Sequence, residues 1–224
     1  MDDADPLERF AAFVRADEFD RLDLPVALIG AAFDRRADVD AVVAELDQLG
    51  QRFEPSFEAI MDGLFGSGLL RGNADDYADP RNSYLHEVLR RRLGLPITLS
   101  IVAVEVGRRC GVRVDGVGLP GHFVVGDGTG ERFADPFHGG RVYDRDGLNS
   151  AWRRITRAPT PLAPAMLLPT PSRAIVVRVL NNLVGTFEQR HDEAHLPIVA
   201  RLRGAVPGIR DEVGARRRWL AGWN

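Results

Sequence analysis

The sequence predicts an α+β protein in which a central buried helix packs on a small antiparallel sheet, with further helices at both ends of the chain. Three observations support this prediction. Apolar residues recur at three- and four-residue spacing up to about residue 73, which is typical of helices. A segment at 97–109 is apolar around most of a helical circumference, and short alternating segments with glycine turns follow it.

The composition places the chain among globular proteins. Its 224 residues are 45% hydrophobic, which is enough to bury a core, and its net charge of -3 offers no basic face for nucleic acid. The single cysteine, Cys110, excludes an intramolecular disulfide and a thiolate metal cluster. The acidic start and the lack of any run of about 18 apolar residues predict a cytoplasmic protein with no membrane partner.

Residues 1–75 form a predicted helical region that packs on the core. Helices are expected around 7–13, from Asp20 to Phe33, around 39–46 and from Phe57 to Leu70. Three glycines, at 63, 66 and 68, weaken the last of these helices. Nothing in this region suggests chemistry.

Residues 76–158 form the predicted core. A helix begins with Asn82 or Ser83 as its N-cap, and the central helix begins at Pro96, where a missing N–H costs nothing. Gly111 lies in the position of a left-handed C-terminal cap.

Short strands are expected after the central helix. Alternation begins at 112–114 and Gly116 interrupts it. His122 to Val125 and Arg132 to Asp135 are predicted antiparallel strands joined by a glycine-rich turn, and Gly140 to Tyr143 is a third ribbon. Helical periodicity then returns at 148–155.

Residues 159–224 form a predicted connector and helical tail. The proline-rich segment Pro159 to Pro171 is either a linker or a strap across the surface. Ser172 is expected to cap a long amphipathic helix, and two short helices follow, Ala194 to Ala205 and Asp211 to Trp223.

Three separated motifs identify a family. They read N-S-Y-L-H-E-V-L-R-R-R-L-G-L-P-I-T-L-S from residue 82, G-V-G-L-P-G-H-F-V-V from residue 116 and F-A-D-P-F-H-G-G from residue 133. The pattern resembles the SirB family of bacterial transglutaminase-like proteins over roughly Gly72 to Tyr143. The tail L-N-N-L-V-G-T-F-E-Q-R is similar to the tetratricopeptide-like helices that follow this core. The resemblance implies a transglutaminase-like, or cysteine-protease-like, core without a cofactor.

The resemblance also implies a catalytic pair. In the superfamily a cysteine opens the central helix, a histidine lies on the next strand and an aspartate on the one after. The histidine position matches His122 and the aspartate position matches Asp135. The helix N-terminus and the imidazole lower the thiol pKa, while the carboxylate orients the imidazole. The cysteine position falls within 96–98, where there is no thiol. Cys110 lies at the opposite helix end, ~20 Å away, so we interpret it as a structural thiol.

Two hydroxyls lie near the expected nucleophile position. Thr98 or Ser100 could serve a hydrolase or acyltransferase with His122 as base and Asp135 as orienting group. For Thr98, a capping or backbone-bonding role is the favoured interpretation.

Three other polar residues are candidates for the cleft. His138 follows Asp135 by three residues, and with His122 it forms an imidazole, carboxylate, imidazole set that suits a divalent metal. A histidine in a surface turn is the simpler interpretation, so we predict no metal. Asn82 and His86 are expected to face the same cleft or to cap the helix.

The sequence therefore favours a non-catalytic transglutaminase-like protein, a pseudoenzyme that acts as a regulator or binds a protein or peptide partner. The alternative is the hydrolase or acyltransferase described above.

Overall fold

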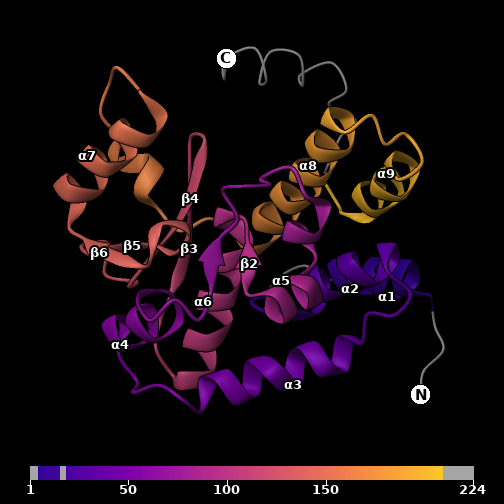
Figure 1. Ribbon diagram of the computed structural model, residues 1–224, viewed down its shortest axis with the longest axis horizontal. Coiled ribbons are helices and arrows are strands. Elements are labelled where there is room, and N and C mark those ends of the chain that lie inside the picture. The colour runs from indigo at the N-terminus through magenta and orange to yellow at the C-terminus, as the bar shows by residue number, and fades with distance from the viewer. Residues whose placement is uncertain (1–4, 16–18, 209–224) are drawn as a thin grey trace.

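The computed structural model describes residues 5–15 and 19–208 (Figure 1). The central helix α6 (Pro96–Cys110) lies between a four-stranded antiparallel sheet and the helices from the two ends of the chain. The predicted α+β class is confirmed. The helix predicted over Asp211 to Trp223 lies outside the described residues.

The N-terminal helices are α1 (Pro6–Val14), α2 (Asp23–Phe33), α3 (Val39–Gly50) and α4 (Phe57–Met61). Side chains of Asp5, Asp38 and Ser56 accept hydrogen bonds from backbone N–H groups at the starts of α1, α3 and α4. α2 begins three residues later than predicted. The helix expected from Phe57 to Leu70 continues only as a π turn, η1 (Asp62–Gly66), so the glycine-rich part does not extend it.

The segment before α6 differs most from the prediction. It contains a short parallel pair, β1 (Arg71–Gly72) with β2 (Leu93–Gly94), which the sequence did not indicate. Between them lie the 3-10 helix η2 (Pro80–Ser83) and α5 (Leu85–Arg91). The predicted cap is wrong, because Asn82 and Ser83 belong to η2 and Tyr84 occupies the N-cap position of α5 without a side-chain bond.

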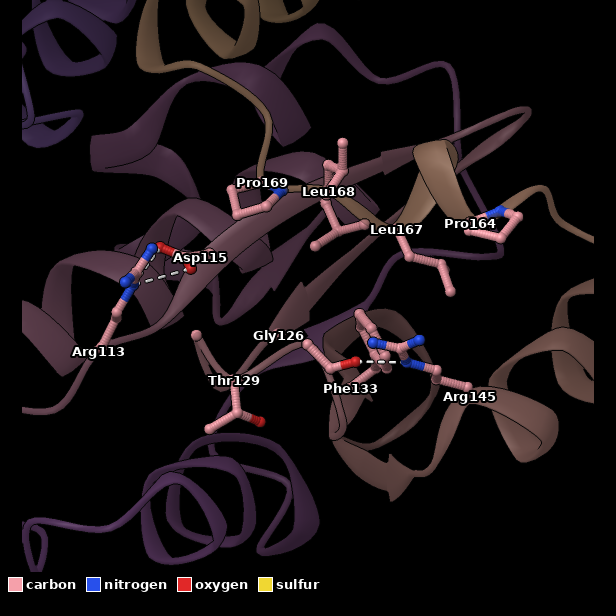
Figure 2. A pocket seen from close by; sticks show the side chains of 13 residues that line it. Arg113, Asp115, Gly126, Thr129, Phe133, Arg145, Pro164, Leu167, Leu168 and Pro169 are labelled. Carbon is pink, nitrogen blue, oxygen red and sulfur yellow. Dashed lines mark hydrogen bonds and ion pairs between the residues drawn. The ribbon is translucent and has the colours of Figure 1, made fainter.

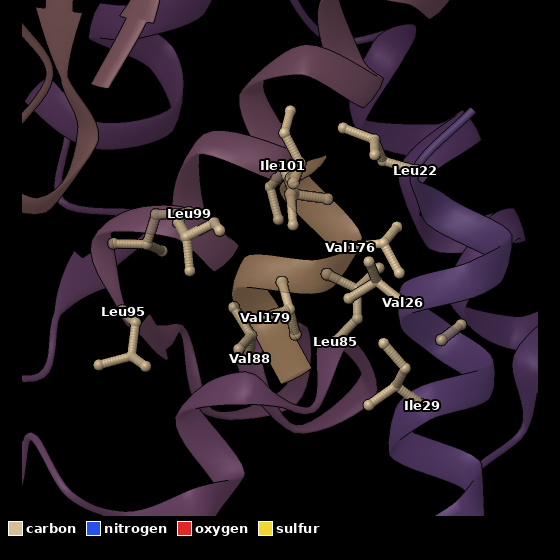
Figure 3. Close-up of a cluster of buried hydrophobic side chains, with 14 of the residues drawn as sticks. Leu22, Val26, Ile29, Leu85, Val88, Leu95, Leu99, Ile101, Val176 and Val179 are labelled. Carbon is tan, nitrogen blue, oxygen red and sulfur yellow. The ribbon is translucent and has the colours of Figure 1, made fainter. Parts of the chain in front are cut away.

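The helix α6 agrees with its prediction at both ends. Pro96 is its first residue, and Gly111 follows its last residue with a φ of 71°. Leu95, Leu99 and Ile101 belong to a large apolar cluster, in which Figure 3 also shows side chains from α2, α5 and α8 (Ser172–Gln189). This cluster draws on residues from all three predicted segments, so they share one core.

A buried ionic network ties α6 to the start of α2. The side chains of Asp23 and Glu105 are fully buried. Glu105 Oε1 accepts a hydrogen bond of 2.7 Å from the Leu22 N–H, and Oε2 accepts from both Arg108 and Arg109. Burial acts to raise the pKa of Asp23, but hydrogen bonds from Arg21 and Arg109 outweigh it, so the pKa is lowered.

The sheet has the order β3 (Asp115–Leu119), β4 (His122–Gly126), β5 (Phe133–Asp135) and β6 (Arg141–Tyr143). The sequence predicted that Gly116 interrupts the alternation, but Gly116 lies inside β3 opposite Val125. The strands carrying His122 and Asp135 are neighbours, as expected.

The predicted connector is a strap. After α7 (Arg145–Thr156), it contains the 3-10 helix η4 (Pro164–Leu167) and follows the outer edge of β3. The Thr170 N–H donates to the Gly116 carbonyl (2.8 Å), and Thr170 Oγ1 accepts from the Gly118 N–H (2.8 Å). Ser172 is not a cap, because it is the first residue of α8 and makes no capping bond. α9 (Leu196–Ala205) packs against α8.

None of the helices in the described ranges combines the length and the apolar character that a membrane crossing requires.

Candidate functional site

The structure brings three of the predicted site residues together. His122 is the first residue of β4 and Asp135 the last residue of β5. His122 Nε2 lies 2.7 Å from Asp135 Oδ2, and His138 Nδ1 lies 2.8 Å from the same oxygen. The side chains of His122 and Asp135 are buried, whereas that of His138 is 43% exposed. His138 is an exposed histidine in the turn η3 (Pro136–His138), as expected, and its hydrogen bond to Asp135 also places it beside the pair.

The carboxylate of Asp135 organises the group. Its Oδ1 accepts hydrogen bonds from the Phe137 and His138 N–H groups, which fixes its orientation. Burial acts to raise the pKa of Asp135, but hydrogen bonds from both imidazoles outweigh it and lower the pKa. The hydrogen bond to Asp135 in turn raises the pKa of His138.

These interactions define which ring nitrogen of a neutral His122 carries the proton. An ionised carboxylate only accepts hydrogen bonds, so both histidines donate their N–H to Asp135. In a neutral His122 ring, Nδ1 is then an unprotonated acceptor, and this atom has no hydrogen-bond partner among the described residues. The pair therefore leaves His122 Nδ1 as a hydrogen-bond acceptor, the arrangement of a cysteine-protease-like site.

The turn that precedes His122 is held from two sides. Arg178 of α8 donates hydrogen bonds to the carbonyls of Leu119 (2.9 Å) and His122 (2.7 Å), and Trp152 Nε1 donates to the Pro120 carbonyl (2.8 Å). Burial lowers the pKa of Arg178. The sequence did not reveal Arg178, because nothing in an amphipathic helix pattern indicates a contact with a distant turn.

One aromatic side chain, Phe137, lies beside the histidines, and a second, Tyr77, packs against Phe137. The Phe137 ring centroid is 6.5 Å from that of His122 and 5.9 Å from that of Tyr77. Gly72 allows this packing, because a Cβ there would lie 2.6 Å from the Phe137 carbonyl. Tyr77 is 51% exposed, so it offers an apolar surface to a ligand. Neither aromatic residue was among the predicted site residues.

The start of α6 contains no accessible nucleophile. Thr98 Oγ1 accepts a hydrogen bond from the Leu95 N–H (2.9 Å) and donates one to the Asn82 carbonyl (2.8 Å), so Thr98 has the expected backbone-bonding role. The side chain of Ser100 is fully buried and its hydroxyl has no partner. Neither hydroxyl is hydrogen-bonded to His122. The hydrolase or acyltransferase alternative gains no support from this geometry.

Cys110 lies at the other end of α6, as expected. Its Sγ donates to the Gly50 carbonyl at 3.1 Å, and burial raises its thiol pKa. Both features are typical of a structural thiol.

The remaining two candidates lie in different places. Asn82 is buried, and its Nδ2 donates to the Asp76 carbonyl at 2.8 Å, so it holds the loop that carries Tyr77. His86 lies against α2, with Nε2 3.5 Å from Asp34 Oδ2, and burial lowers its pKa. It makes no contact with the His122 group, so the structure does not bring it into this site.

A separate cavity of about 360 Å³ lies between the strap and the β3–β4 hairpin (Figure 2). Leu167, Leu168 and Phe133 give it an apolar lining, with Arg113 and Arg145 at its sides. Asp115 is paired with Arg113, and Arg145 donates to the Gly130 carbonyl.

Comparison with known proteins agrees with these features. Residues 34–181, more than half of the chain, match a family model described as the transglutaminase-like superfamily. The chain is 37% identical over 195 residues to a UPF0162 protein of Xylella fastidiosa, which covers 83% of this chain and 66% of the relative. A UPF0162 protein of Pseudomonas aeruginosa is 29% identical over 194 residues, covering 86% of this chain and 64% of the relative. The chain thus spans slightly less than two thirds of the length of these relatives.

A shorter similarity extends to a mammalian protein. F-box only protein 21 of Mus musculus is 33% identical over 90 residues, which cover 40% of this chain and 14% of that protein. No solved structure matches the chain. The match over residues 34–181 shows that the chain belongs to the transglutaminase-like superfamily.

Proposed function

We propose that this protein is a non-catalytic member of its superfamily that binds a protein or peptide segment beside His122, as the resemblance to the SirB regulators implies. One observation carries the proposal. The histidine and aspartate of a cysteine-protease-like site are hydrogen-bonded as catalysis would require, yet the start of α6 has no thiol, and its two hydroxyls, on Thr98 and Ser100, are fully buried and not hydrogen-bonded to His122.

The site offers the contacts that an extended peptide needs. His122 Nδ1 accepts a hydrogen bond from a peptide N–H, while the exposed Tyr77 and its neighbour Phe137 provide an apolar surface for a side chain. The anchoring of the His122 turn by Arg178 and Trp152 keeps the acceptor in place, which reduces the entropy lost on binding.

We also propose a cytoplasmic location, since the single cysteine suits a reducing compartment. The resemblance of the tail to tetratricopeptide-like helices stays a prediction; up to residue 208, the last that the structure describes, the tail contributes α8 and α9, and a solenoid groove needs about three repeats.

Reactive probes test the absence of catalysis. Wild type and His122→Ala are treated with a thiol-reactive and a serine-reactive probe, and labelled sites are mapped by mass spectrometry. We expect no labelling of Thr98 or Ser100, and any labelling of Cys110 to be equal in the two proteins. Labelling of either hydroxyl that disappears in His122→Ala would establish the hydrolase or acyltransferase instead.

Peptide display tests the binding function. Sequences enriched on the wild-type protein are measured against Tyr77→Ala and His122→Gln, with Met166→Ala as a matched change of an exposed apolar residue on the strap. We expect each site variant to weaken binding about tenfold or more, equivalent to ~1.4 kcal/mol, and the control to bind as the wild type does. Failure to enrich any sequence, or equal binding by both site variants, would overturn the proposal.

A further inference from the structure

We propose that His122, Asp135 and His138 together bind a divalent transition-metal ion. One ligand atom of each residue lies within 4.8 Å of those of the other two, and His122 Nε2 and His138 Nδ1 both contact Asp135 Oδ2. The inference does not rest on peptide binding: with an ion bound, His122 Nδ1 carries the ring proton and donates instead of accepting a peptide N–H, so the two forms of the site are alternatives.

The identity of the donor atoms selects the class of metal. Two imidazole nitrogens and one carboxylate oxygen suit zinc and its neighbours, whereas calcium and magnesium prefer sites made only of oxygen. Three protein ligands leave a tetrahedral zinc ion one position for water or for a group from a bound molecule.

The distances require only a small adjustment. Zinc bonds to nitrogen and oxygen measure about 2.0–2.1 Å, so ligand atoms in a tetrahedral site lie about 3.3 Å apart. The two imidazole nitrogens now lie 2.7 and 2.8 Å from Asp135 Oδ2. Each contact must lengthen by about half an ångström, which small rotations of the rings provide.

The protons balance without a further reactant. The ion takes the place of the two N–H protons that now lie between the imidazoles and the carboxylate. Each neutral ring keeps one proton, which moves to its other nitrogen, and His122 Nδ1 is free to receive it because it has no partner among the described residues. The His138 ring is 43% exposed. Solvent therefore accepts a hydrogen bond from its Nε2–H once Nδ1 binds the ion, and an ion can enter from that side.

The surroundings of the carboxylate also suit a metal ligand. Asp135 Oδ1 accepts two backbone N–H groups, so Oδ2 alone is directed at the imidazoles. Partners of this kind orient ligating carboxylates in metal sites. A second group, Asp34, His86 and Glu87, has donor atoms at similar spacing, but Arg90 donates to both carboxylate oxygens of Glu87.

Zinc titration of the chelator-treated full chain tests the proposal by calorimetry, and cobalt gives an absorption spectrum that reports tetrahedral coordination. We expect one ion per chain in the wild type. The affinity for zinc should be at least tenfold weaker in His138→Ala and in His122→Gln. His138 is exposed, so its substitution should leave the fold intact. His86→Gln changes the second group and Cys110→Ala removes the thiol, so both serve as controls that bind zinc as the wild type does.

Nuclear magnetic resonance of the histidine rings gives a readout that needs no variant. Zinc should shift the signals of two rings and leave the other three of the five histidines unchanged. The proposal is overturned if no ion binds at one per chain, if both site variants bind zinc as tightly as the wild type, or if His86→Gln or Cys110→Ala removes binding. Peptide display in the presence of chelator tests the proposed function separately.

Discussion

Replacing Glu105 by glutamine should destabilise the protein strongly, because Glu105 joins two helices from a fully buried position. The change keeps an oxygen for the Leu22 N–H but removes the charge that accepts three hydrogen bonds from Arg108 and Arg109. Removal of one partner from a buried ion pair costs about 3–5 kcal/mol. Asp23 still pairs with Arg109, so we expect the lower half of that range.

Urea unfolding followed by circular dichroism measures this effect. A loss of about 3–4 kcal/mol corresponds to a fall in melting temperature of about 6–16 °C for a chain of this size. Arg36→Ala is the matched control, because the Arg36 side chain is 91% exposed and solvent screens its ion pair with Asp34, so this variant should unfold as the wild type does. If Glu105→Gln unfolds within about 1 kcal/mol of wild type with an unchanged denaturant slope, the network does not stabilise the junction of α2 and α6 as argued.

Three further substitutions, two of them with a control variant, give smaller, directional effects. Thr98→Val leaves a backbone donor and acceptor unpaired at the start of α6 and should cost about 1–3 kcal/mol by urea unfolding, whereas Thr98→Ser should retain most of the stability. Ser100→Ala removes a buried hydroxyl without a partner, so unfolding should show equal or higher stability; a loss above about 1 kcal/mol would contradict this. Burial lowers the pKa of His86 in the folded protein below its ordinary value of 6.5. As the pH falls below 6.5, His86 therefore binds a proton in the unfolded chain before it does so in the folded protein, and the free energy of unfolding decreases. Unfolding at about pH 7.5 and about pH 5.5 should show a smaller fall for His86→Gln than for the wild type, while His191→Asn, a change of an exposed histidine, should match the wild type.

The sequence predicted the centre of the fold better than its borders. The limits of α6 follow from Pro96 and Gly111, whose backbone preferences act locally and are visible in the chain. The pair β1 and β2 was missed because two-residue strands carry no periodicity. The cap of α5 was misplaced because η2 holds Asn82 and Ser83 in a 3-10 turn, which amide and hydroxyl side chains also favour.

In the candidate site, too, residues within a sequence motif were predicted and residues placed by tertiary packing were not. His122 and Asp135 were found because a family pattern fixes their order, and the pairing of β4 with β5 places them together. Tyr77 and Arg178 were not found, since their roles depend on how a loop and a distant helix pack around the sheet. His86 was expected to face the cleft or to cap the helix, but it lies within α5, with its ring against Gly30 of α2 and Asp34.

The contact of Thr170 with Gly116 and Gly118 has a consequence for self-association. An outermost strand with free backbone groups is a template on which another molecule adds a strand of its own. In this protein two of those groups on β3 are already occupied by the same chain. Displacement of the strap would uncover them and turn the hairpin into a site for intermolecular strand addition and aggregation.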